Sequence, residues 1–117
     1  MASVTTSGTN DFLTTLTTKP AWIGGYKTGT TWNWSNERGF SYTNWKSGEP
    51  NNLGGVQYRI QINHEIVGIW DDLQGSAELA YICEMQGKLN ENQMVKIHVY
   101  KSLNLQTHSF LFNMFMF

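Results

Sequence analysis

In the first quarter of the chain, apolar residues first recur at helical spacing and then form a continuous run. Within residues 1–18, apolar residues recur at helical spacing at Phe12, Leu13 and Leu16. This pattern predicts a short amphipathic helix that is capped by Thr9 or Asn10 and stopped by Lys19-Pro20. The continuous run 21–26 then predicts a short buried strand that ends in glycines.

The middle of the chain, from residue 27 to 53, has little periodicity and is rich in Gly, Asn, Ser, Thr and Trp. An unpatterned stretch of this length is uncommon in a compact domain and is usually functional when it is ordered. Its aromatic residues predict a loop that packs onto its own small core. These residues are Trp32, Trp34, Phe40, Tyr42 and Trp45. Strand-like runs at 56–62, 66–70 and 79–83, with a turn at Asn63-His64, predict a small antiparallel sheet beside this loop.

The pattern changes again after Glu84. Residues 95–100 alternate between apolar and polar, which predicts one more strand. The chain ends in an apolar run, 110–117, which is far too short to span a bilayer because a spanning helix needs ~20 apolar residues. That run is interfacial, buried or an unselected extension, and the pattern leaves these three interpretations open.

Size, charge and cysteine content narrow the classes of function. The chain has 117 residues, which fit one small domain. Charged residues make up 15% of it, the formal net charge is −1 and the basic residues are scattered, which argues against nucleic-acid binding. Cys83 is the only cysteine, so no intramolecular disulfide can form. Residues 1–18 lack the apolar segment of a signal peptide, so the residues alone predict none.

The clearest candidate chemistry lies in Glu49-Pro50-Asn51 and, about twenty residues later, Trp70-Asp71-Asp72. Carboxylate and amide oxygens are suited to a hard cation such as Ca²⁺, which takes about 6–8 oxygen ligands. One protein cluster leaves coordination positions open for an outside ligand, and a sugar with vicinal hydroxyls would suit them. The sequence carries no phosphate loop and no nucleophile elbow, so we do not expect an enzyme.

Several ordered motifs together resemble the C-type lectin-like domain, over about residues 2 to 84. They are the strand Ala21-Trp22-Ile23-Gly24-Gly25, the loop Asn44-Trp45-Lys46-Ser47-Gly48-Glu49-Pro50-Asn51, the element Trp70-Asp71-Asp72 and the closing strand Tyr81-Ile82-Cys83-Glu84. The resemblance implies an α+β fold with small antiparallel sheets, one helix and a long ligand-binding loop. It also implies an extracellular or cell-surface protein whose weak sites gain avidity in an oligomer.

The chain departs from the family pattern at its start and at the cysteines. The family's first strand and first helix have no counterpart here, so Cys83 resembles the closing cysteine of a disulfide whose partner is missing. Arg59 and Gly75 stand where the family usually has a second disulfide. The resemblance therefore implies a partial or divergent domain at 1–84, followed by a C-terminal extension at 85–117. A further hypothesis is that the strand at 95–100 fills the vacant sheet edge.

The resemblance also implies a metal site. The metal ligands it implies are Glu49, Asn51, Gln57, Asp71 and Asp72, with Pro50 in the cis form. The carbohydrate would contact Glu49, Asn51, Gln57 and Asp71. Gln57 replaces the family's glutamate and Asp71 its asparagine, so a hydrogen-bond donor and an acceptor have changed places while the number of carboxylates is kept.

The function expected from this site is calcium-dependent binding of mannose-type glycans, because Glu-Pro-Asn resembles the tripeptide of mannose-binding members. Two alternatives stay open at the level of the sequence. One is a lectin-like domain that binds a protein without metal. The other is a truncated product without function.

Overall fold

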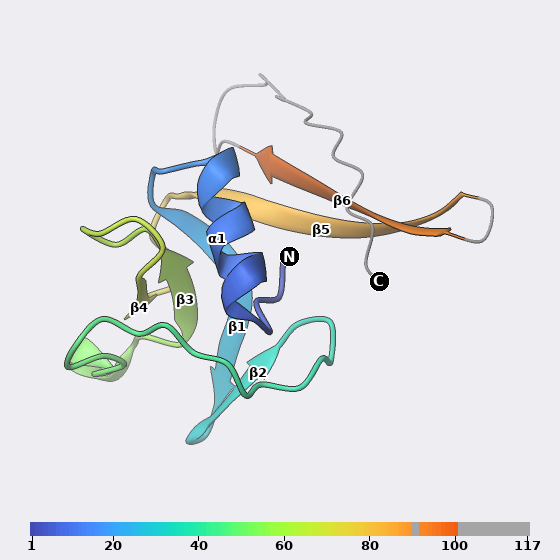
Figure 1. The fold of residues 1–117 in the computed structure, drawn as a ribbon. Helices are drawn as coiled ribbons and strands as arrows, with labels where there is room; N and C mark the ends of the chain where they lie inside the picture. Colours follow the sequence, from blue (N-terminus) through green and yellow to red (C-terminus); the bar gives the residue numbers. More distant parts are fainter. Residues whose placement is uncertain (90–91, 101–117) are drawn as a thin grey trace.

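The computed structural model describes residues 1–89 and 92–100, and the side chains up to residue 85. One helix lies against a sheet of six strands (Figure 1). In chain order the elements are α1 (Ser7–Leu16), β1 (Ala21–Thr28), β2 (Thr31–Trp34), the 3-10 turn η1 (Leu53–Gly55), β3 (Arg59–Ile62), β4 (Trp70–Leu73), β5 (Ala80–Leu89) and β6 (Asn92–Tyr100). The α+β class expected from the sequence is confirmed.

Helix α1 begins one turn earlier than its predicted caps. Thr6 is the N-cap, and its hydroxyl oxygen accepts a hydrogen bond from the Thr9 backbone N–H at 3.1 Å. The prediction of a cap at Thr9 or Asn10 is therefore wrong. Asn10 instead lies buried within the helix, where its side chain accepts from Trp70 Nε1 at 2.7 Å and donates to the Gly68 carbonyl at 3.0 Å.

The sheet has the order β4-β3-β1-β5-β6, and β2 pairs with β1 outside this path. All pairs are antiparallel except β1 with β5, which run parallel at Ala21↔Ala80 and Trp22↔Tyr81. Beyond these two residue pairs, the N-terminal segment forms backbone hydrogen bonds with both β1 and β5. Ala2 donates its N–H to the Ile82 carbonyl at 2.9 Å and accepts from the Gly24 N–H at 2.7 Å.

Aromatic residues of the long loop pack together, as predicted, and they do so around Trp70 of β4. Trp70 is fully buried, and its ring meets those of Trp34, Tyr42 and Trp45 edge-on at centroid distances of 5.7, 5.8 and 5.7 Å. Trp22 is also buried, in agreement with its expected core position. Edge-to-face packing of this kind stabilises beyond the area that it buries. The loop is thus fixed to the sheet that carries Trp70.

The strands after this loop differ from the prediction in their bounds. The run 66–70 was expected as a strand, and this is wrong, because β4 begins only at Trp70. Ile66 and Val67 lie in the β3–β4 turn, 59% and 51% exposed. Asn63 holds that turn with a positive φ of 66° and a side chain that accepts from the Gly68 N–H. The short strand β2 was not foreseen within the unpatterned region.

Strand β5 continues past the predicted end at residue 83, as far as Leu89, and β6 pairs with it antiparallel from Tyr81↔Tyr100 to Leu89↔Asn92. The strand expected at 95–100 is confirmed, and it lies at one end of the sheet order. Its role as a substitute for a missing family strand stays a prediction. The apolar run 110–117 lies outside the described residues.

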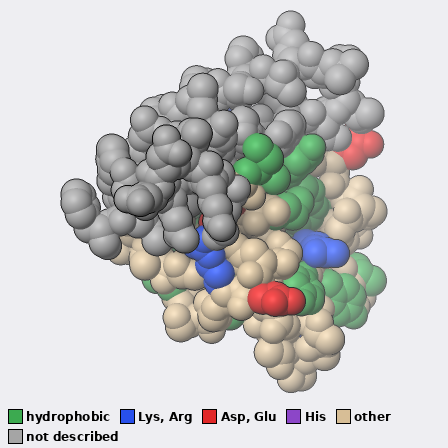
Figure 2. All heavy atoms as spheres, turned by 90° about the vertical axis from the view of Figure 1, so that its right-hand side faces the viewer, with side chains coloured by type: hydrophobic (Ala, Val, Ile, Leu, Met, Phe, Trp, Pro, Cys, Tyr) green, Lys and Arg blue, Asp and Glu red, His purple; other side chains and the backbone are tan. Residues whose placement is uncertain are grey.

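The described surface agrees with the low charge of the chain. On the face in Figure 2 the charged side chains are few and do not gather into one patch. Among residues 1–89 and 92–100, no helix combines the length and the apolar character that crossing a bilayer requires.

Candidate functional site

The backbone after Pro50 is bound to the end of the sheet by Asp72 of β4. Asp72 is fully buried, and its two carboxylate oxygens accept the N–H groups of Asn51 at 3.1 Å and Asn52 at 2.7 Å. The Glu49-Pro50 peptide bond is cis, as the family resemblance implied. The loop that carries η1 therefore lies beside β3 and β4 (Figure 1).

Three of the predicted ligands come together at this junction. Glu49, Asp71 and Asp72 each present a carboxylate oxygen within 4.8 Å of the other two. Burial, the neighbouring Asp72 carboxyl group and the negative charge of Asp71 raise the pKa of Glu49 to about 7. A nearby cation would stabilise the charged form of such a carboxyl group and lower its pKa again. We call these three residues the acidic cluster.

The two predicted amide ligands lie next to the acidic cluster but contact it differently. Asn51 donates from Nδ2 to Glu49 Oε1 at 3.0 Å. The Leu53 N–H donates both to Asn51 Oδ1 at 2.9 Å and to Gln57 Oε1 at 2.7 Å. These hydrogen bonds join Gln57 to the carboxylates by way of Leu53 and Asn51. All five predicted site residues thus belong to one connected set.

Sequence reasoning missed Gln61, which holds Asp71 in place. Gln61 is 4% exposed and donates from Nε2 to Asp71 Oδ2 at 3.0 Å. The sequence analysis placed Gln61 in the strand-like run 56–62 and gave it no role. It is buried because the register of β3 and β4 sets it directly opposite Asp71. No local pattern sets this register, so the sequence alone does not bring Gln61 beside Asp71.

The donor set of the acidic cluster fits a hard divalent cation. It offers carboxylate oxygens, with amide oxygens adjacent, and these are the ligands that Ca²⁺ prefers. The nearby Lys46 forms an ion pair with Glu65 instead. Among the described side chains, the acidic cluster forms one ion-pair contact, between His64 Nε2 and Asp71 Oδ2 at 3.7 Å. The chain thus leaves most of the negative charge of the cluster without an internal counter-ion.

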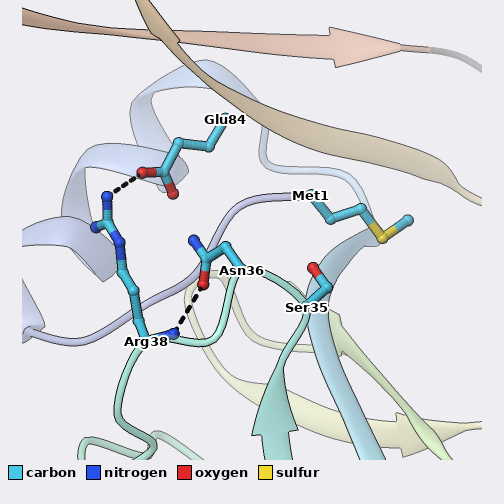
Figure 3. A pocket seen from close by; sticks show the side chains of 5 residues that line it. All are labelled: Met1, Ser35, Asn36, Arg38 and Glu84. Atoms are coloured by element: carbon cyan, nitrogen blue, oxygen red, sulfur yellow. Dashed lines mark hydrogen bonds and ion pairs between the residues drawn. The ribbon is translucent and has the colours of Figure 1, made fainter.

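Away from the acidic cluster, a cavity of about 250 Å³ lies near the N-terminus between the long loop and β5 (Figure 3). Its lining residues are Met1, Ser35, Asn36, Arg38 and Glu84. Figure 3 shows Arg38 turned toward Glu84, with Nη2 and Oε1 2.6 Å apart. The acid and the base that line this cavity are therefore paired with each other.

The positions expected for a second disulfide are also neighbours. A Cβ added to Gly75 would lie 3.5 Å from Arg59 Cγ, so the two residues face each other as the resemblance implied. Cys83 is a free, partly buried cysteine. The packing of Arg59 over Gly75 thus stands where the resemblance placed a covalent bridge.

Comparison with known proteins identifies the family. The family model described as the lectin C-type domain matches residues 1–85. Perlucin of Haliotis laevigata is 32% identical over 56 residues, which cover 47% of this chain and 36% of perlucin. A lectin of Pleurodeles waltl is 31% identical over 93 residues, covering 72% of this chain and 54% of that lectin. The chain therefore spans only about a third to a half of these relatives.

Solved structures show the same fold. The C-type lectin CEL-I from Cucumaria echinata superposes with a TM-score of 0.59 at 22% identity, covering 66% of this chain and 61% of that one. The cow CD23 carbohydrate-recognition domain, determined in the presence of a GlcNAc2Man3 oligosaccharide, gives a TM-score of 0.55 at 26% identity over 62% of this chain and 57% of that one. The chain belongs to the C-type lectin domain family, a family of lectins rather than enzymes.

Proposed function

We propose that this domain binds mannose-type glycans through one Ca²⁺ ion that is held by the five predicted ligands. These ligands are Glu49, Asn51, Gln57, Asp71 and Asp72. The observation that carries the proposal is the convergence of three carboxylates from two distant segments, with His64 as the one described side chain in ion-pair contact with them. The ion would supply the positive charge, and two sugar hydroxyls would complete its coordination.

The hydrogen bonds around the ion support a specific arrangement of the sugar. Gln61 engages Asp71 Oδ2, which leaves Oδ1 of Asp71 to accept from a sugar hydroxyl. Gln57 would donate to the same hydroxyl through its Nε2. A hydroxyl both donates and accepts, so it satisfies this exchanged pair as well as the family's usual one. The oligosaccharide present with cow CD23 contains mannose, which supports the same sugar class here.

A calcium titration followed by a glycan titration tests the proposal. Calorimetry should detect one Ca²⁺ site, and methyl α-mannoside should bind in calcium but not in EDTA. Glu49→Ala should eliminate both signals, since it deletes a charged ligand. Unchanged calcium affinity in Glu49→Ala would remove the acidic cluster from consideration.

A metal-independent interaction domain is the second candidate. The observation that favours it is the Leu53 N–H, which occupies one acceptor position on both Asn51 Oδ1 and Gln57 Oε1. A site without calcium would keep these hydrogen bonds in every state. Under this function, a ligand captured in calcium would stay bound after the addition of EDTA.

The remaining parts of the proposal follow from the family. We expect the domain to be extracellular or at the cell surface, as the family resemblance implies, with its lectin fold in residues 1–84 and an extension at 85–117. Single sites of this kind bind weakly, and an oligomer would raise the avidity without any new contact.

A further inference from the structure

Residues 51–58 form a loop in which several polar side chains bind the backbone and the large apolar side chains are exposed, the reverse of the usual surface pattern. The polar side chains bind the backbone of the loop itself. Asn51 and Gln57 accept from the Leu53 N–H, and Asn52 Oδ1 accepts from the Gln57 N–H at 2.9 Å. Gln57 is 9% exposed, although it is polar and lies in a surface loop.

The apolar side chains of the same loop face solvent. Leu53 is 70% exposed, Val56 50% and Tyr58 45%. The Tyr58 hydroxyl donates to the Gly55 carbonyl at 2.7 Å, which holds the ring across the loop. We call Leu53, Val56 and Tyr58 the apolar rim. A contiguous exposed apolar patch that is rimmed by polar groups marks a binding surface more often than an isolated apolar residue does.

The apolar rim adjoins the proposed sugar site along the chain, because Leu53 and Val56 flank the amide ligands in sequence. Leu53 stands between the two amide ligands, and its N–H binds both of them. A monosaccharide on the calcium would reach the polar groups only and would leave the rim in water. A ligand that covers both needs a polar sugar joined to an apolar group.

We propose that the apolar rim binds the alkyl or aryl aglycone of a soluble glycoside whose sugar is held at the calcium. The inference rests on the proposed function and adds the class of ligand. Three side chains within six residues offer far less area than the ~1,000 Å² that a specific protein interface needs. They suit one short hydrocarbon chain. The loop is already fixed by its own hydrogen bonds, so binding orders little that was free.

Calorimetry with matched glycosides tests the inference in calcium buffer. The probes are the methyl and hexyl α-glycosides of mannose and, in parallel, of galactose, so the result does not depend on the sugar preferred. The hexyl form should bind about tenfold tighter than the methyl form, as expected when about two methylene groups leave water. Leu53→Asn combined with Val56→Thr should abolish this difference and keep the affinity for the methyl glycoside and for calcium.

The matched control is Ile66→Asn. Ile66 is 59% exposed in the neighbouring β3–β4 turn and is not part of the rim, so this variant should keep the full preference for the hexyl glycoside. Equal affinity of the wild type for the two chain lengths would overturn the inference and leave the proposed function intact. Absence of calcium-dependent binding for all four glycosides would overturn both.

Two further results would assign the rim to another occupant. If only vesicles that carry an alkyl mannoside bind, and the soluble hexyl glycoside gains nothing, the rim contacts a membrane and the inference is wrong. If the rim variant changes self-association while glycoside binding is unaltered, the rim is a protein contact and the inference is equally wrong.

Discussion

Two glutamates of this domain lie in opposite electrostatic surroundings. Glu84, on β5, has a counter-ion within the chain, because Arg38 Nη2 lies 2.6 Å from its Oε1. Its Oε2 also accepts from the backbone N–H and the hydroxyl of Ser3, both at 3.3 Å. Glu49, in the long loop, faces two further carboxylates, and its pKa is raised to about 7. The charge of the first carboxylate is balanced by an arginine, whereas the second accepts hydrogen bonds from Asn51 and has no ion pair among the described side chains.

The comparison separates a structural acid from the one that we propose binds a ligand. Burial of a charge is tolerated where a partner and hydrogen bonds accompany it, as around Glu84. The acidic cluster has hydrogen bonds from backbone N–H groups and from Gln61, but these do not cancel its negative charge. A divalent cation would do so. The following variants test this difference, in order of decreasing effect.

The largest effect is expected from Asp72→Ala. This change removes the carboxylate acceptor of the partly buried Asn52 N–H and one of the two acceptors of the Asn51 N–H, and a lost hydrogen bond to a charged group costs about 1.5–3 kcal/mol. We expect the free energy of unfolding to fall by about 2 kcal/mol in EDTA, measured by urea denaturation. Asp72→Asn, which keeps one acceptor oxygen, should lose about half as much. Unchanged stability in both variants would show that Asp72 does not hold the loop.

A smaller effect is expected from Glu84→Gln. The ion pair with Arg38 is lost, but the Arg38 side chain is 32% exposed and water takes over part of the interaction. We expect a loss of about 1 kcal/mol in the free energy of unfolding. Calcium affinity, measured by calorimetry, should stay at the wild-type value. A parallel loss of calcium affinity would mean that the two regions are not separate.

The smallest effect is expected from swapping the hydrogen-bond donor and acceptor roles of two proposed ligand residues. Gln57→Glu with Asp71→Asn restores the donor and acceptor positions of the family pattern, and Gln61 can donate to the new Asn oxygen as it does to Asp71. Methyl α-mannoside should bind severalfold tighter in calcium, with little change in stability. Equal affinity in the double variant would show that the exchange is neutral for the sugar.

Much of the fold was predictable because the signals were local. The run 21–26, the alternation at 95–100 and the aromatic residues of the long loop predicted β1, β6 and the core around Trp70. The errors have tertiary causes. Asparagine is a favoured N-cap residue, yet the side chain of Asn10 is hydrogen-bonded to Trp70 and Gly68 inside the helix packing. The apolar pair Ile66-Val67 suggested a strand but lies in a turn that Asn63 holds through its side chain.

The candidate site was predictable in its charged residues and less so in its supporting ones. Glu49, Asp71 and Asp72 were inferred from two short motifs, and the structure brings their oxygens together. The role of Gln61 depends on the register between β3 and β4, which no local pattern encodes. The hydrogen bonds that Asn51 and Gln57 accept from the Leu53 N–H were not predicted either, because the hydrophobic pattern carries no information on them.

Thermal unfolding in calcium and in EDTA tests the central claim, that the acidic cluster needs an external cation, most directly. At a calcium concentration a hundred times Kd, the wild type should gain about 2.7 kcal/mol and unfold at a higher temperature. Glu84→Gln should gain the same amount, and Glu49→Gln should gain little. A wild-type domain that unfolds at the same temperature in both buffers would contradict the account.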